Sequence, residues 1–150
     1  IDLVEDGFNP TMTATDLAQY NRGKTTDPLV AKYGDLLLGT DELIIIFPIW
    51  WGMMPAIFKG FIDKVLLKGL AYRYSDDGAM LPALNIRRAL LITTSQGPTP
   101  LYRHFIEDTL ILFVLNSVGI TGVEWMNCER TAHGPRENRE DFLKKVIAKA

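Results

Sequence analysis

The chain has 150 residues, of which 47% are hydrophobic and 23% charged, and its formal net charge is -2. This composition is typical of one globular domain, and the balanced charge gives no support to a nucleic-acid or anionic-membrane surface. A single Cys128 excludes an internal disulfide, no apolar stretch reaches the roughly 20 residues that span a bilayer, and the first residues lack a basic signal-peptide start, so a cytoplasmic protein is predicted.

Apolar runs alternate with helical patterns in the first half of the chain. A short strand is predicted at residues 1–4, followed by a helix at 13–20 with Thr13 as its N-cap and a helix that begins at Pro28 after a capping Asp27. The continuous apolar run 42–47 is rich in isoleucine and predicts a strand covered on both faces, which Pro48 ends.

The second half continues the alternation. Helices are predicted at 55–66, 105–118 and 135–150, and strands at 88–94 and 122–128. The apolar residues of 55–66 cover a broad arc, so this helix is expected to be buried on more than one side. Strands this apolar, alternating with helices, predict a single α/β domain built as a doubly wound parallel sheet with helices on both faces.

Two loops directly follow strands of this predicted sheet, where ligands of doubly wound proteins bind. The first carries Trp50, Trp51, Met53 and Met54, whose flat or polarisable surfaces suit contact with a planar ring. The second, "TTSQGP", supplies hydroxyl and amide groups for hydrogen bonds. Together they predict a slot for a planar heterocycle. The alternatives are a tryptophan pair in the core or a dimer contact, and an ordinary loop.

Three segments carry a family resemblance: "FPIWWGMMPAIFKGFIDKV", "GLAYRY" and "RALLITTSQGP". In this order, over most of the chain, they resemble the flavodoxin-like NAD(P)H:quinone oxidoreductases. The resemblance implies a homodimer that binds FMN or FAD and passes a hydride from NAD(P)H through the flavin to quinones or similar acceptors.

The same resemblance assigns site residues. The loop against the flavin ring corresponds to Pro48, Ile49, Trp50, Trp51 and Gly52, and the loop at the polar edge of the ring to Thr93, Thr94, Ser95, Gln96 and Gly97. The family's Thr-Thr-Gly-Gly here reads "TTSQ", which is a departure from the pattern. The catalytic Tyr and His of the family correspond to Tyr102 and His104, although His104 also suits a solvated helix start.

The resemblance also implies an N-terminally incomplete flavin-binding domain, because residues 1–10 match the family's second strand and its exit. The first strand and the phosphate loop would then precede Ile1. Two other functions stay open: a flavodoxin-like electron carrier, which the net charge of -2 does not favour, and a flavin-bearing regulatory subunit of a potassium-efflux system. Two distant histidines and one cysteine give no support to a metal site.

Overall fold

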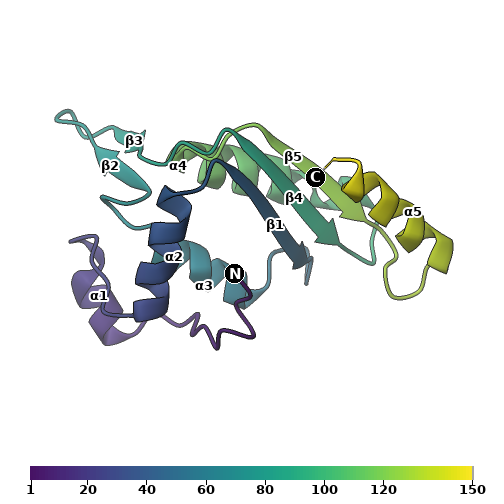
Figure 1. The fold of residues 1–150 in the computed structure, drawn as a ribbon, viewed down its shortest axis with the longest axis horizontal. Helices are drawn as coiled ribbons and strands as arrows, with labels where there is room; N and C mark the ends of the chain where they lie inside the picture. The colour runs from purple at the N-terminus through teal and green to yellow at the C-terminus, as the bar shows by residue number, and fades with distance from the viewer. Residues whose placement is uncertain (150) are drawn as a thin grey trace.

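The computed structural model describes residues 1–149 and contains a three-stranded parallel sheet (Figure 1). Its strands are β1 (Glu42–Pro48), β4 (Arg88–Thr94) and β5 (Val123–Cys128), in the order β1-β4-β5. All three strands were predicted to within one residue at each end. Because the pairings are parallel, their carboxyl ends meet at one edge of the sheet.

Helices connect and cover the strands. They are α1 (Ala14–Tyr20), α2 (Pro28–Leu38), α3 (Ala56–Val65), η1 (Thr99–Tyr102), η2 (His104–Leu115), α4 (Asn116–Val118) and α5 (Arg136–Ile147). The predicted caps are confirmed: Thr13 and Asp16 form a capping box, and the Asp27 side chain accepts from the first turn of α2. None of the helices within residues 1–149 has both the length and the apolarity needed to cross a bilayer.

The core lies between the sheet, α3 and η2. Phe47 of β1 stacks on Phe58 of α3 with ring centroids 5.0 Å apart, and Leu91 of β4 shares a buried cluster with Leu110 of η2. Residues Leu90 and Ile92 of β4 alternate with this set and are buried as well. Burial on both faces of β4 confirms the predicted doubly wound arrangement.

The strand predicted at residues 1–4 is wrong. These residues form turns, in which the Asp2 carboxylate accepts the backbone N–H groups of Val4 and Glu5 at 3.0 and 3.1 Å. A strand needs a neighbour to receive its hydrogen bonds, and within residues 1–149 this segment pairs with no strand; its local turns are held by the Asp2 side chain instead. A two-stranded antiparallel hairpin that was not predicted, β2 (Tyr72–Tyr74) and β3 (Met80–Pro82), extends from the body of the domain.

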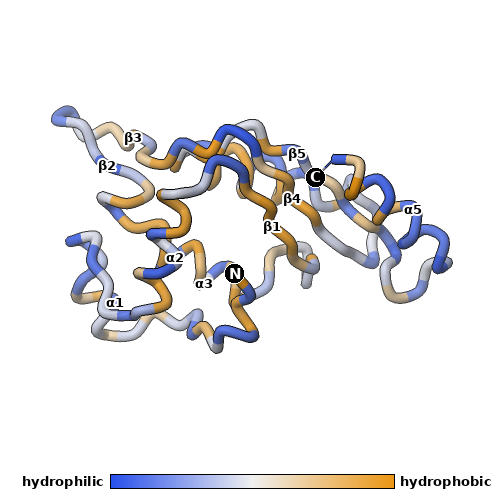
Figure 2. The backbone as a smooth tube through the Cα atoms, in the orientation of Figure 1, coloured by the Kyte–Doolittle hydropathy of each residue, from blue (hydrophilic) through white to orange (hydrophobic). Residues whose placement is uncertain are grey.

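The outer edge of β1 is open. Within residues 1–149 the strand pairs with β4 alone, and it is apolar along most of its length (Figure 2). Ile44 and Ile46 are 52% and 69% exposed on one face, so the prediction that both faces of this strand are covered is wrong. A groove of ≈ 530 Å³ runs along this edge, lined by β1, by α3 and by the turns that begin at Ile1. An unpaired, apolar strand edge is prone to bind another strand.

The fold predicts a loss of stability at high pH. Tyr33 of α2 is fully buried and donates its hydroxyl proton to Asp6 at 2.6 Å. Burial, and secondarily this hydrogen bond, raise the pKa of Tyr33 from 10.0 to about 12. The folded state therefore retains a proton that the unfolded chain loses near pH 10, so this contribution is complete below pH 10 and is lost between pH 10 and 12.

We expect the free energy of unfolding to fall as the pH rises from 9 to 11.5, and to fall less steeply in Tyr33→Phe. Denaturant titrations at a series of pH values measure both slopes. Equal slopes for the two proteins would show that Tyr33 is not the group responsible.

Candidate active site

The loop after β1 is a tight hairpin turn. Trp50 and Met53 exchange two backbone hydrogen bonds of 2.9 and 3.0 Å around the central residues Trp51 and Gly52, whose φ values are 52° and 79°. Two positive φ angles define a turn in which asparagine and glycine are favoured. A tryptophan in this conformation is an outlier, and backbone outliers of this kind concentrate at functional sites.

This turn displays its aromatic residues instead of burying them. Trp51 is fully exposed and Trp50 is 62% exposed, while Ile49 before them is buried and anchors the loop by donating its N–H to the Thr94 carbonyl at 2.8 Å. The alternative in which both tryptophans belong to the core is therefore wrong. The same hydrogen bond holds the two predicted loops side by side at the carboxyl edge of the sheet.

The loop after β4 is held from within by buried side chains. Thr93 is fully buried: its hydroxyl donates to Asn127 Oδ1 at 2.9 Å and accepts from Trp125 Nε1 at 2.8 Å. Ser95 is also buried, donates to the Gly97 carbonyl and accepts from Asn127 Nδ2, both at 2.9 Å. These two hydroxyls therefore support the loop and do not face outward.

Thr94 and Gln96 alternate with this inward pair. Within residues 1–149 neither the Thr94 hydroxyl nor the Gln96 backbone N–H has a hydrogen-bond partner, which leaves a donor and a donor-acceptor at this edge. The Gln96 side chain is engaged elsewhere, since its Oε1 accepts the Ala132 N–H at 2.8 Å. Of the polar groups that the sequence predicts at the flavin edge, the Thr94 hydroxyl and the Gln96 backbone N–H are therefore the ones still available to a ligand within residues 1–149.

Tyr102 joins the loop and His104 does not. The Tyr102 hydroxyl oxygen accepts the Gly97 N–H at 3.1 Å, and a Cβ at Gly97 would collide with that hydroxyl. Glycine therefore preserves the close contact between this loop and the Tyr102 hydroxyl. The His104 side chain is 90% exposed and pairs with Asp108 at 2.8 Å along η2, as expected of a solvated helix start.

Sequence reasoning missed Asn127, the residue that ties the polar loop together. It lies opposite Thr93 in the β4–β5 register, and its amide group makes three hydrogen bonds, including one to Thr99 Oγ1 at 3.0 Å. An asparagine near the carboxyl end of a strand beside a "TTSQ" loop is the signal that would have found it.

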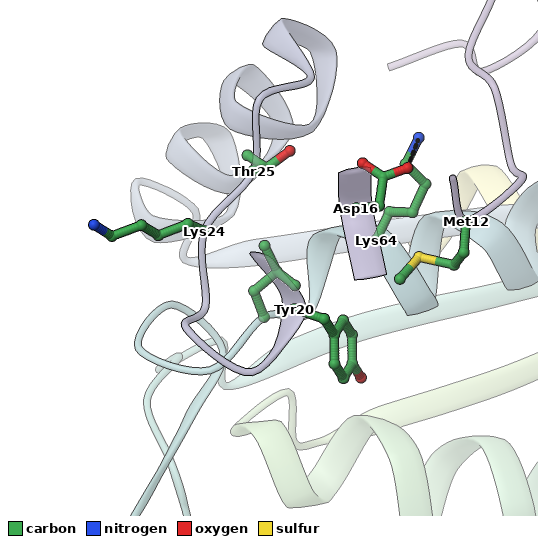
Figure 3. Close-up of a pocket in the computed structure, with 7 residues that line it drawn as sticks. Met12, Asp16, Tyr20, Lys24, Thr25 and Lys64 are labelled. Atoms are coloured by element: carbon green, nitrogen blue, oxygen red, sulfur yellow. Dashed lines mark ion pairs between the residues drawn. The ribbon is translucent and has the colours of Figure 1, made fainter. Parts of the chain in front are cut away.

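A second cleft, between α1 and α3, is a structural feature (Figure 3). It is lined by Met12, Asp16, Tyr20, Lys24, Thr25, Lys64 and Leu67, and its ≈ 10 Å³ is room for about one water molecule. Lys64 and Asp16 point toward each other across it, with 3.6 Å between Nζ and Oδ2. Charges that are already paired in so small a space leave no room for a substrate.

The fold and the two loops define a doubly wound α/β protein whose candidate ligand site lies beyond the carboxyl ends of β1 and β4. A family model described as the flavodoxin-like fold matches residues 1–150. The chain belongs to this family, and the resemblance inferred from its sequence is confirmed.

The chain is similar to several known proteins. The uncharacterized NAD(P)H oxidoreductase YcaK of Escherichia coli K12 is 40% identical over 93 residues, which are 61% of this chain and 46% of YcaK. The FMN-dependent NADH:quinone oxidoreductase 2 of Clostridium acetobutylicum is 26% identical over 155 residues, covering 100% of this chain and 76% of that protein. The crystal structure of Smu.1420 from Streptococcus mutans UA159 superposes with a TM-score of 0.83 at 30% identity, covering 99% and 79%. The chain thus spans about half the length of YcaK.

Proposed function

We propose that the chain forms the ring-binding part of a flavin-dependent oxidoreductase that passes a hydride from NAD(P)H through the flavin to quinones or similar acceptors. The proposal is carried by the pairing of two exposed tryptophans with a polar loop in which, within residues 1–149, the Thr94 hydroxyl and the Gln96 N–H have no hydrogen-bond partner. An isoalloxazine ring has flat faces and one edge of polar atoms, so both halves of the site suit it.

The chain's own residues would bind and orient the ring. Trp50 and Trp51 offer faces for stacking, and the Thr94 hydroxyl and Gln96 N–H offer hydrogen bonds to the polar edge. The flavin, when bound, supplies the acceptance and release of the hydride. The Tyr102 oxygen accepts from Gly97, and within residues 1–149 its hydroxyl proton has no acceptor, so this proton can be donated to charge that develops beside the loop.

We propose FMN as the flavin, because the Clostridium relative is named as FMN-dependent. We propose the cytoplasm as the compartment, because the single Cys128 is buried and free. Titrating the purified protein with FMN should quench its tryptophan fluorescence, because Trp50 and Trp51 would contact the ring. FAD added in parallel measures the preference between the two flavins. A protein that stays colourless and unquenched with either one would refute flavin binding.

We propose a homodimer through the exposed apolar surface of η2. Leu112 and Phe113 are 63% and 75% exposed, and burying each would contribute about 1.5 to 3 kcal/mol. Analytical ultracentrifugation should give twice the monomer mass at micromolar concentration, and Phe113→Glu should shift it to monomer. A wild-type protein that sediments only as monomer would contradict this assembly.

We also propose that the groove along β1 takes a strand that precedes Ile1 in a longer chain, as the incomplete-domain prediction implies. The support is the open edge itself, with Ile44 and Ile46 exposed and Ile1 lining the same groove. Hydrogen exchange of the β1 amides should slow when such a segment is present. Unchanged exchange in β1 would show that the added segment lies elsewhere.

A further inference from the structure

The segment after β5, residues 129–134, lies against the polar loop on the side away from the tryptophan turn. The sheet order β1-β4-β5 puts the loop after β4 between the other two. Three residues of the polar loop form hydrogen bonds with segment 129–134. The Ser95 carbonyl accepts the Thr131 N–H at 3.1 Å, Gln96 Oε1 accepts the Ala132 N–H at 2.8 Å, and the Thr99 N–H donates to Glu129 Oε1 at 2.6 Å.

The segment is itself fixed. Arg139 of α5 donates from Nη1 to the carbonyls of Thr131 and Gly134 at 2.9 and 3.0 Å, and the Thr131 hydroxyl donates to the Cys128 carbonyl at 2.9 Å. A rigid support therefore stands behind the polar loop.

Gln96 differs from the other linked residues, because its contact is made by a side chain that stands where the resembled family has glycine. The bond to Ala132 draws this side chain toward β5 and so away from Trp50 and Trp51. The backbone N–H of Gln96 is left without a partner within residues 1–149. In Gln96, therefore, the side chain is held by Ala132 while the backbone N–H has no partner within residues 1–149.

We propose that Gln96 is a positioning residue: its side-chain bond to Ala132 fixes the polar loop so that the backbone N–H of Gln96 is held in place for an acceptor atom on the edge of a bound ring. This inference rests on the proposed flavin site. It assigns to the "TTSQ" departure a role that glycine cannot perform, because glycine has no side chain to tether.

Two variants separate the tether from the size of the side chain. Gln96→Leu keeps a long side chain but removes the acceptor, whereas Gln96→Glu retains an oxygen that can accept the Ala132 N–H. The first measurement needs no flavin: amide exchange of Ala132, with the Ile86 amide as internal control. Ile86 is fully buried and donates to the Gly119 carbonyl at 3.0 Å, so it reports global opening.

We expect Ala132 to exchange faster in Gln96→Leu and at the wild-type rate in Gln96→Glu, with Ile86 unchanged in both. The second measurement is the FMN dissociation constant. It should rise about three- to tenfold in Gln96→Leu, as for one lost hydrogen bond, and return close to the wild-type value in Gln96→Glu.

Other outcomes overturn the inference in distinguishable ways. Unchanged exchange of Ala132 in Gln96→Leu would show that the tether is not made in solution. Faster exchange with an unchanged dissociation constant would show a tether that positions nothing. If the wild-type protein does not bind FMN, the proposed function and this inference both fail, whatever the exchange measurement gives.

Discussion

Replacing Lys64 with methionine should cost the protein about 3 to 5 kcal/mol of stability, the loss typical of a buried ion pair from which one partner is removed. The Lys64 side chain is 3% exposed, and its Nζ lies 3.0 Å from Asp27 Oδ2, 3.0 Å from the Asn9 carbonyl and 3.6 Å from Asp16 Oδ2. The ammonium group also lies 5.4 Å from the centre of the Phe8 ring. One side chain of α3 thus joins the N-terminal loop, α1 and the start of α2.

The methionine variant keeps most of the apolar stem and removes only the charge and its hydrogen bonds. Two carboxylates, 11% and 23% exposed, would then lose the cation between them. Denaturant unfolding followed by circular dichroism measures the difference, and the loss should appear in the midpoint of the transition.

Lys59 of the same helix provides the matched control. It pairs with Asp63 at 2.6 Å, a shorter distance than any made by Lys64, but the two side chains are 55% and 40% exposed. Exposed pairs of this spacing contribute about 0.3 to 0.5 kcal/mol, so Lys59→Met should change stability very little. Equal losses in the two variants would show that burial does not decide the strength of these pairs.

The strands were predictable because continuous apolar runs leave a direct mark in the sequence, although of β1 and β4 only β4 is buried on both faces. "ELIIIF" and "RALLITT" are continuous apolar runs, and β1 and β4 begin at the predicted residues. The helix caps at Thr13 and Asp27 are local interactions, so they could be predicted as well. The segment at residues 1–4 has the composition of a strand, but a strand is made by its neighbour, which local sequence does not show.

The hairpin of β2 and β3 escaped prediction because its strands are three residues long and partly polar. The turn residues Asp77 and Gly78 between two apolar segments are the one local signal for it. Short strands contribute little periodicity, so only the turn could have indicated them.

The position of the candidate site was predictable, but the directions of its side chains were not. Strand patterns placed both loops at one edge of the sheet, whereas Thr93 and Ser95 point inward and Gln96 turns toward β5. Asn127 decides those directions, and it meets Thr93 only through the β4–β5 register. Strand register brings together residues that are 34 positions apart in the chain, and the periodicity of a single strand does not reveal such a pairing.

Trp51→Ala should reduce flavin affinity and quinone turnover about tenfold while it leaves the stability of the flavin-free protein within about 1 kcal/mol of the wild type. Trp51 is fully exposed, so no packing is lost when its ring is removed. Alanine has a Cβ like tryptophan, so the cost of the 52° φ angle is shared by both proteins. A stacking contact with a flat ring is the interaction that the variant removes.

Trp125, which lies opposite Leu91 in the middle of β5, is the matched control. It is partly buried against the core and donates its indole N–H to Thr93 at 2.8 Å, so Trp125→Ala should cost about 3 kcal/mol without flavin, the low end of the range for core aromatics. Denaturant unfolding of the flavin-free proteins, FMN titration, and quinone reduction per mole of bound flavin measure the three quantities separately.

The two tryptophans should therefore give opposite patterns: Trp51→Ala a loss of binding and turnover in a stable protein, and Trp125→Ala a loss of stability. If Trp51→Ala is as destabilised as Trp125→Ala yet keeps normal turnover, Trp51 is part of the scaffold and the ring-binding role of this turn is wrong. If it keeps both stability and flavin affinity but sediments as a monomer where the wild type is a dimer, the exposed ring belongs to a subunit interface. Only a selective loss of flavin affinity supports the proposal, because stacking on a ligand is the contact that exists with flavin and is absent without it.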